Sequence, residues 1–254
     1  MSEHLNAMRD RLVEIGLPDY PLVLAVVAFD DLREFGHFAD EYIDLLLDVA
    51  DAQATVVMNS FTWSVCETGE FSKASTPSEC GLASEIFRRT DGVQRSNHPI
   101  FSMTARGPLA HTVLAHTGPT CWGDGTPAEV LVDKNAFCVS IGKEFPRSLT
   151  VLHSFEEWRQ VPYLAFKTFS GEADYGNGPD AYSTEFFVPP DRGIRDIDYA
   201  WAPAVDLLLE RGLVRGAEFD LPVRGVFAKD LRTVVYELLD ADPYAFVRDS
   251  LGRS

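Results

Sequence analysis

The sequence predicts an α/β protein, a layered α/β/α sandwich around a mixed, largely parallel central sheet. The apolar run at residues 21–29 has the length of a strand and no polar alternation, which is typical of a strand covered on both faces. Residues 55–61 form a second strand-like run, and residues 38–49 between them have helical spacing. A strand, a helix and a strand in this order favour parallel pairing through a right-handed crossover.

An amphipathic helix is predicted at the start of the chain, over residues 3–15, ending at Gly16. Its apolar positions recur at helical spacing: Leu5, Met8, Leu12 and Ile15. The helix over residues 38–49 has a similar apolar side, formed by Tyr42, Leu45, Leu46 and Val49. Each of the two helices therefore has one face that can pack against other parts of the protein.

A capping signal predicts another helix that begins near Pro77. Thr76 can accept hydrogen bonds from free backbone amides, Pro77 fits the first helical position, and Glu79 can reach back to the start of the helix. Apolar residues from Leu82 onward share one face, and Gly92 is placed to end the helix in a left-handed cap.

Shorter elements follow. We expect helices over residues 108–115, from Pro127, and over 150–158, 198–211, 229–239 and 242–246, and strands over 136–141, 163–169 and 183–188. No linker rich in Pro, Gly or Ser and no run of charge divides the sequence, so we expect a single domain over residues 1–254.

Composition narrows the class of partner. The 254 residues carry 22 basic and 39 acidic side chains, a net charge of −17, which disfavours nucleic acid and anionic membranes and is compatible with a cationic small-molecule amine. The apolar runs are too short to span a bilayer and the N-terminus lacks a secretory pattern, so we expect a cytoplasmic protein. The four cysteines lack the paired spacing of a metal site, so we expect no metal. The sequence leaves a monomer and a homodimer both open.

The most distinctive motifs lie between residues 67 and 107. They are ETGEF at 67–71, TPS at 76–78, Gly92-Val93, and RSNHP at 95–99 followed by Ser102 and Gly107. Farther along come His116, GDGTP at 123–127 and LHSFE at 152–156. This ordered series closely resembles the aminoglycoside 3-N-acetyltransferase family from about Thr62 to Glu156, and more weakly beyond. The resemblance implies an N-acyltransferase that uses acetyl-CoA, or another acyl-CoA, as its co-substrate.

His153 and Glu156 are the candidate catalytic residues. An amine must be neutral to attack a thioester, so a base beside it is useful, and His is suited to that role at neutral pH. Positions i and i+3 of a helix share one face, so the Glu156 carboxylate can fix the tautomer of His153. The resemblance implies that His153 is the general base and that Glu156 orients it. Glu157 is a competing partner, although a surface charge is the simpler interpretation of that residue.

The resemblance also implies the residues that bind the two substrates. For the acyl donor these are Leu32, Arg33, Thr62, Ser96, His98 and Ser102. For a cationic acceptor they are Glu67, Asp196 and Asp198. For His98 an alternative stays open, in which the ring satisfies buried backbone groups in a tight loop before Pro99. Arg95 similarly has an alternative role as the partner of Glu67 or Glu85 in a buried ion pair.

The turn after the first strand departs from the family pattern. Relatives carry His-Ser-Ser-Leu-Arg there, whereas this chain has Phe29-Asp30-Asp31-Leu32-Arg33. Two carboxylates beside the phosphates of an acyl carrier would be repulsive. Three functions therefore stay open: an N-acetyltransferase for an aminoglycoside or related amino sugar, in resistance or self-protection; a biosynthetic acyltransferase with another acyl donor or amine; and a non-catalytic binder of small molecules. The retained His153 and Glu156 disfavour the binder.

Overall fold

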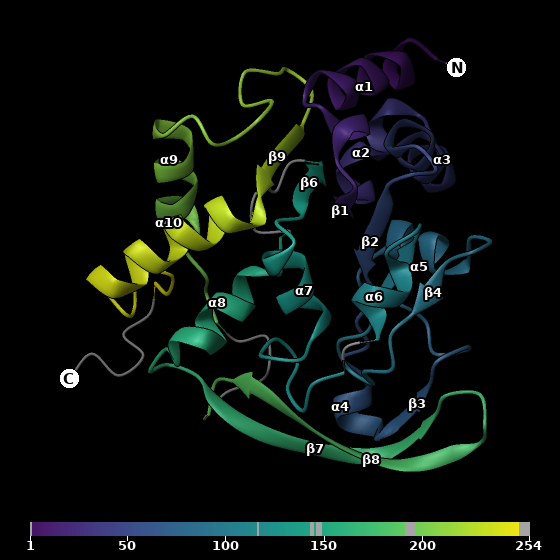
Figure 1. Ribbon diagram of the computed structural model, residues 1–254, viewed down its shortest axis with the longest axis vertical. Coiled ribbons are helices and arrows are strands. Elements are labelled where there is room, and N and C mark those ends of the chain that lie inside the picture. The colour runs from purple at the N-terminus through teal and green to yellow at the C-terminus, as the bar shows by residue number, and fades with distance from the viewer. Residues whose placement is uncertain (1, 116, 143–144, 146–148, 191–196, 249–254) are drawn as a thin grey trace.

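The computed structural model describes residues 2–115, 117–142, 145, 149–190 and 197–248 (Figure 1). His116 and Asp196, which the sequence analysis singled out, lie outside the described residues. At the centre is a six-stranded sheet in the order β4-β5-β2-β1-β6-β9. Its strands are β1 (Leu22–Val27), β2 (Thr55–Asn59), β4 (Gln94–Arg95), β5 (Met103–Arg106), β6 (Phe137–Ile141) and β9 (Val223–Phe227).

The sheet is parallel at its centre and antiparallel at both edges. Strand β1 pairs in parallel with β2 and β6, and helix α3 (Ala39–Ala50) connects β1 to β2, which confirms the predicted parallel pairing. Strands β5, β4 and β9 pair in antiparallel fashion with β2, β5 and β6. These three strands carry no clear strand signal in the sequence, because they are short and contain exposed or half-buried polar side chains such as Gln94, Arg106 and Arg224.

Helices cover both faces of this sheet, as the sandwich prediction requires. One buried apolar cluster joins β1 and β2 to α1 (Glu3–Glu14), α3 and α5 (Leu82–Arg89). A second cluster joins the opposite side chains of the same strands to α6 (Ala110–Leu114), α7 (Pro127–Asp133), α8 (Leu152–Arg159), α9 (Ala202–Glu210) and α10 (Ala228–Ala241). Along β1 the alternation is direct, because Val23 and Ala25 belong to the first cluster, and Leu22 and Leu24 to the second.

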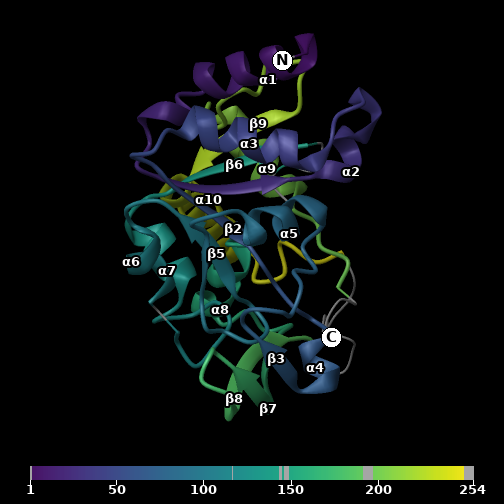
Figure 2. The same ribbon diagram turned by 90° about the vertical axis from the view of Figure 1, so that its right-hand side faces the viewer.

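A second, three-stranded sheet lies at the end of the molecule farthest from α1 (Figures 1 and 2). Its order is β3-β7-β8, with β3 (Glu70–Ser72), β7 (Ala165–Asp174) and β8 (Pro179–Val188). Strands β7 and β8 form a hairpin that extends beyond the two predicted strands, because the Asp174 carboxylate accepts hydrogen bonds from the amides of Gly176 and Gly178 and closes the turn. A Cβ on Gly171 would lie 1.9 Å from the carbonyl oxygen of Gly69, so glycine is needed where β3 meets the hairpin.

The predicted helix start near Pro77 is wrong, because α5 begins only at Leu82, after Gly81. The capping groups have partners elsewhere in the structure. The Thr76 hydroxyl accepts from the amide of Ser72 instead of capping a helix. The Glu79 carboxylate accepts from the amide of Ser64, which precedes the short helix α4 (Val65–Thr68). Non-local partners thus displace a locally plausible cap.

The predicted helix over residues 242–246 is also wrong. Helix α10 ends at Ala241, and the next residues form a turn in which the Asp242 carboxylate accepts from the amide of Tyr244. The other predicted helices are present with ends shifted by up to four residues. Within the described ranges, none of the helices combines the length and the hydrophobicity that a bilayer crossing requires.

Candidate functional site

A pocket of about 490 Å³ lies between the segments that follow β2 and the inner side of the β7–β8 hairpin. It therefore lies beyond the carboxyl end of a central parallel strand, the usual place for a ligand in an open α/β sheet. The described residues that line it are Phe61, Trp63, Glu79, Cys80, Phe101, Trp122, Thr150, His153, Phe186, Phe187, Val188, Pro189, Ile197 and Tyr199.

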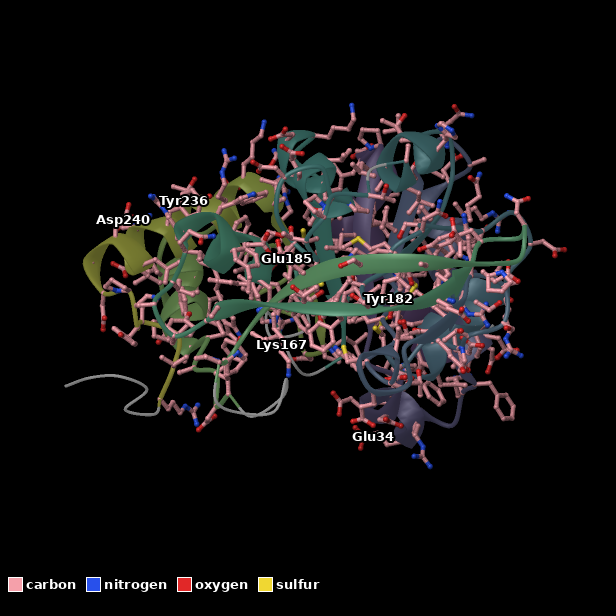
Figure 3. The ribbon with its side chains drawn as sticks, turned by 90° about the horizontal axis from the view of Figure 1, so that it is seen from below. Glu34, Lys167, Tyr182, Glu185, Tyr236 and Asp240 are labelled. Carbon is pink, nitrogen blue, oxygen red and sulfur yellow. The ribbon has the colours of Figure 1, made fainter. Side chains whose placement is uncertain are left out.

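Helix α8 carries His153 into this wall. The helix is fixed from behind, since Leu152 and Phe155 are buried in the core at 1% and 0% exposure. At its far end, Arg159 donates to the Asp240 carboxylate at 2.9 Å and lies 4.0 Å from the ring centroid of Tyr236, and both partners are on α10 (Figure 3). Packing on two sides therefore sets the position of the histidine.

His153 and Glu156 make the contact that their spacing predicts. Nδ1 of His153 lies 2.6 Å from one carboxylate oxygen of Glu156, and the histidine side chain is 28% exposed whereas that of Glu156 is fully buried. If Nδ1 donates to the carboxylate, Nε2 carries the lone pair, which is the tautomer that a general base requires. The predicted geometry of the pair is present, and its catalytic role stays a proposal.

Tyr163 completes the setting of Glu156. Its hydroxyl donates to the other carboxylate oxygen at 2.6 Å, from the segment just before β7. Burial and the neighbouring carboxylate raise the pKa of Tyr163, so this hydroxyl keeps its proton. Each oxygen of the buried Glu156 thus accepts one hydrogen bond, which holds the carboxylate, and through it the imidazole, in one orientation.

Aromatic side chains surround His153. The ring centroids of Tyr199, Trp122 and Trp201 lie 5.2, 5.7 and 6.2 Å from that of the imidazole. Opposite, the Asn59 side-chain amide at the end of β2 donates to the Thr150 hydroxyl at 2.7 Å and ties the sheet to the pocket wall. His153 is therefore held in a largely apolar site in which a bound polar group would be partly desolvated.

Four of the predicted donor-binding residues are buried in the loop that follows β2 and in the RSNHP segment. Thr62 donates to the carbonyls of Pro99 and Ile100. Ser96 accepts from the amide of Met103 at 2.9 Å. Ser102 donates to the carbonyl of Ser60 at 2.6 Å. These contacts, with exposures of 0 to 1%, give the three hydroxyls partners within the loop itself, and their contact with an acyl donor stays a prediction.

His98 is also buried, and its ring bonds backbone amides of the loop, as its alternative interpretation predicts. Its Nδ1 accepts from the amides of Ile100 and Phe101 at 3.2 and 2.9 Å, so Nε2 carries the proton and lies 3.0 Å from the Thr184 hydroxyl on β8. Burial lowers the pKa of His98 to about 4, which keeps the ring neutral. His98 thus links the loop to the hairpin and does not line the pocket.

The ion pair of Arg95 with Glu67 or Glu85, which the sequence left open as an alternative, is absent among the described contacts. The buried guanidinium instead donates to the Ser102 hydroxyl and to the carbonyls of Ser60, Lys73 and Thr76. Glu85 pairs with Arg88 and Arg89 on its own helix. Arg95 therefore holds three loop segments together.

The turn that follows β1 lies away from the pocket wall. It forms α2 (Phe29–Leu32) and a 3₁₀ turn, η2 (Arg33–Phe35). Figure 3 shows Glu34, in this turn, apart from the β7–β8 hairpin. Leu32 is buried in the apolar cluster. The side chains of Asp30 and Arg33 are 91% and 68% exposed and lie 3.6 Å apart. If this turn contacts an acyl donor, the contact is with a part of the donor that lies outside the pocket.

Of the predicted acceptor residues, the two that the structure describes, Glu67 and Asp198, do not line the pocket. Glu67 is exposed on α4 and does not line it. Asp198 is 60% exposed and lies 4.0 Å from the guanidinium of Arg248, although its neighbours Ile197 and Tyr199 do line the pocket. Among the described lining residues, the carboxylate is that of Glu79, for which the sequence predicted a helix-capping role.

Glu157, the competing partner of His153, has another role. The residue is 4% exposed, its carboxyl bonds the Thr120 side chain and the Trp122 backbone, and one oxygen has no partner among the described residues. Burial raises the pKa of Glu157, helped by the nearby carboxylates of Asp124 and Glu185. Glu157 therefore supports the loop that carries Trp122.

Comparisons with known proteins agree with the motif series. Residues 26–177 match the family model described as aminoglycoside 3-N-acetyltransferase. An aminoglycoside N(3)-acetyltransferase III from Salmonella sp is 31% identical over 105 residues, which are 41% of this chain and 36% of that protein. A protein of the same name from Acinetobacter baumannii is 31% identical over the same length. The matched segment thus spans about a third of these curated relatives.

Solved structures resemble the whole fold. The aminoglycoside acetyltransferase AAC(3)-IVa apoenzyme has a TM-score of 0.77 at 22% identity, covering 97% of this chain and 92% of that one. AAC-IIIb in a binary complex with CoASH has a TM-score of 0.77 at 20% identity, with coverages of 97% and 98%. AAC-VIa bound to sisomicin has a TM-score of 0.75 at 20% identity, with coverages of 93% and 97%. At these identities the likeness concerns the fold.

Proposed function

The chain belongs to the aminoglycoside 3-N-acetyltransferase family, and on this premise we propose that it is an N-acyltransferase that moves an acetyl group from acetyl-CoA to an amine. The observation that carries the proposal is the pair of His153 and a fully buried Glu156 in the wall of a ligand-sized pocket. Family membership points to an aminoglycoside or a related amino sugar as the acceptor.

The reaction assigns one step to each group. The acceptor reacts as the neutral amine, and Nε2 of His153 takes the proton that its nitrogen loses as it attacks the thioester carbonyl carbon. The tetrahedral intermediate collapses, the carbon–sulfur bond breaks, and the CoA thiolate takes up the proton from the imidazolium. Glu156 stabilises that imidazolium through Nδ1, and Tyr163 holds Glu156. Both substrates gain from being held in line in the pocket.

The acidic turn bears on the acyl donor. Asp30 and Asp31 do not line the pocket, so they do not border the thioester carbon. Repulsion would act on the phosphates of the carrier, outside the pocket. A second candidate function, an acyltransferase of the same fold with another acyl donor or another amine, is favoured by this exposed acidic turn.

Calorimetric titration of the protein with acetyl-CoA, and with free CoA for comparison, tests the donor. Micromolar binding supports the proposal and leads to an amine screen by thiol release. Absence of binding by either compound contradicts acetyl-CoA as the donor and favours the second candidate. The Asp30→Asn/Asp31→Asn double variant tests whether the acidic turn contacts the acyl carrier. If it does, the variant binds acetyl-CoA and CoA more tightly than the wild type, and if it does not, both affinities stay unchanged.

A further inference from the structure

We propose that Glu79 determines which amines the pocket accepts, by forming an ion pair with a second ammonium group of the acceptor while another amino group of the same molecule lies at His153. The acceptor is therefore a polyamine, and a molecule with one amino group is a poor substrate. This inference rests on the proposed function and agrees with the acceptor class to which family membership points. It assigns the ionic contact to a residue outside the set that the resemblance implies.

Glu79 places a carboxylate at the mouth of the pocket. Its side chain is exposed and also lines the pocket, so it lies at the rim. Its backbone amide donates to the carbonyl of Phe61 at 2.8 Å, and Phe61 lines the same pocket, which fixes the main chain of Glu79 there. Among the ion pairs between described residues, none includes Glu79, so no described neighbour neutralises its charge.

Ser64 holds this carboxylate in place. One oxygen of Glu79 accepts from the hydroxyl of Ser64 and from its amide at 3.1 Å, and the other oxygen lies 3.3 Å from the same amide. A carboxylate has about four acceptor positions, so capacity remains for the N–H groups of an ammonium. A side chain that is already held loses less conformational freedom when it binds a ligand. The carboxylate is thus oriented before the acceptor arrives.

Trp63 adds a second group that attracts a cation at the same rim. It directly precedes Ser64, is half-buried and lines the pocket. Its indole packs edge-to-face against Phe61, with the ring centroids 5.8 Å apart and the planes at 77°, which fixes the ring. Of the aromatic side chains, tryptophan forms the most favourable cation–π contact with an ammonium. A fixed carboxylate and a fixed indole together suit a charged amino group.

The amino group at Glu79 and the one at His153 need opposite protonation states. A carboxylate favours the charged ammonium, whereas attack on the thioester requires the neutral amine. The described contacts lead from Glu79 to Phe61, from the Phe61 ring to Trp122 at 5.3 Å, and from Trp122 to His153 at 5.7 Å. The cavity of about 490 Å³ that these residues line has room for a sugar ring. One amino group cannot serve both places, so the acceptor needs two.

Direct binding tests the inference without turnover. Calorimetric titration with sisomicin, which carries several amino groups, is run at 0.15 M salt, where the Debye length is about 8 Å. Glu79→Gln keeps an oxygen for Ser64 and removes only the charge, so it should weaken sisomicin about fivefold. Glucosamine, which has one amino group, should bind the wild type about fivefold more weakly than sisomicin, or weaker still. Wild-type affinity of Glu79→Gln for sisomicin, equal binding of the two amines, or no binding of sisomicin by the wild type overturns the inference.

A matched pair of charge reversals separates the local contact from the overall charge. Glu79→Lys and Glu70→Lys change the net charge of −17 equally, but Glu70 is exposed on β3 and does not line the pocket. We expect Glu79→Lys to weaken sisomicin at least as much as Glu79→Gln does, and Glu70→Lys to leave the affinity unchanged. Equal losses in the two lysine variants would show that surface charge alone attracts the amine, which contradicts the proposed contact.

Thiol release from acetyl-CoA separates this inference from the proposed function. Because the ion pair exists before and during transfer, Glu79→Gln should raise KM for sisomicin about fivefold and leave kcat unchanged. If sisomicin binding depends on Glu79 but no amine releases thiol, transfer fails and the ionic contact stands. If sisomicin releases thiol with the same KM in wild type and Glu79→Gln, transfer stands and the role of Glu79 is wrong.

Discussion

Replacement of Glu156 by Gln tests the role of the buried carboxylate most sharply. The side chain keeps its shape but loses its charge, while both of its present contacts, to Nδ1 of His153 and to the hydroxyl of Tyr163, measure 2.6 Å. Because Glu156 is fully buried, water does not replace the lost charge. The imidazolium that forms during proton transfer then has no adjacent anion.

The expected magnitude follows from Coulomb's law. Two unit charges about 4 Å apart at an effective dielectric constant of about 20 attract by about 4 kcal/mol. The amide oxygen of Gln still accepts one neutral hydrogen bond, worth about 1 kcal/mol. The remaining difference of about 3 kcal/mol corresponds to a fall in kcat/KM of about a hundredfold.

The assay is the initial rate of thiol release from acetyl-CoA with the best amine found, for wild type, Glu156→Gln and the matched control Glu157→Gln. The control should stay within about threefold of wild type, because the neighbouring carboxyl is held by Thr120 and Trp122 and burial raises its pKa, which disfavours the charged form. Long-range proton–nitrogen NMR of the imidazole should place the proton on Nδ1 of His153 in the wild type. Glu156→Gln with wild-type kcat/KM, or a proton on Nε2 in the wild type, would refute the role assigned to Glu156.

Three further predictions concern groups that support the site. Tyr163→Phe removes one hydrogen bond to Glu156 without opening a cavity, so kcat should fall about five- to tenfold with little change in KM, and an unchanged kcat would exclude Tyr163 as a positioning residue. Burial lowers the pKa of His98 from 6.5 to about 4, so between these two pH values the unfolded chain binds the proton more readily than the folded protein. The contribution of His98 to the free energy of unfolding is therefore full above about pH 6.5 and falls by roughly 2 kcal/mol between pH 7 and pH 5. Urea unfolding should show a smaller fall over this range for His98→Gln. Gly171→Ala places a Cβ 1.9 Å from the carbonyl oxygen of Gly69 and should lower the free energy of unfolding by about 1–3 kcal/mol, whereas Ser170→Ala on the exposed neighbour should leave it nearly unchanged in the same urea titration.

Periodic and local signals made the central architecture predictable. The apolar run at residues 21–29 became β1, buried between two helical layers, because a strand covered on both faces needs no polar positions. His153 and Glu156 were predictable because their contact depends on one turn of one helix. Local chemistry sufficed in both cases.

The pocket wall could not be predicted in this way. Phe61, Phe101, Trp122, Phe186 and Tyr199 are spread over about 140 residues and meet only after folding, and none stands in a pattern distinct from that of a core residue. Ser96, His98 and Ser102 show why a polar loop is hard to interpret from sequence. A dense run of small polar side chains resembles a binding site in sequence, but a tight loop needs the same groups to satisfy its own buried amides and carbonyls.

The central claim is that His153 accepts the proton of an amine during acetyl transfer. Thiol release from acetyl-CoA by the wild type, by His153→Ala and by His111→Ala, which changes an exposed histidine outside the pocket, tests it most directly. We expect a loss of about a hundredfold or more for His153→Ala and wild-type rates for His111→Ala. Comparable turnover by wild type and His153→Ala would contradict the account.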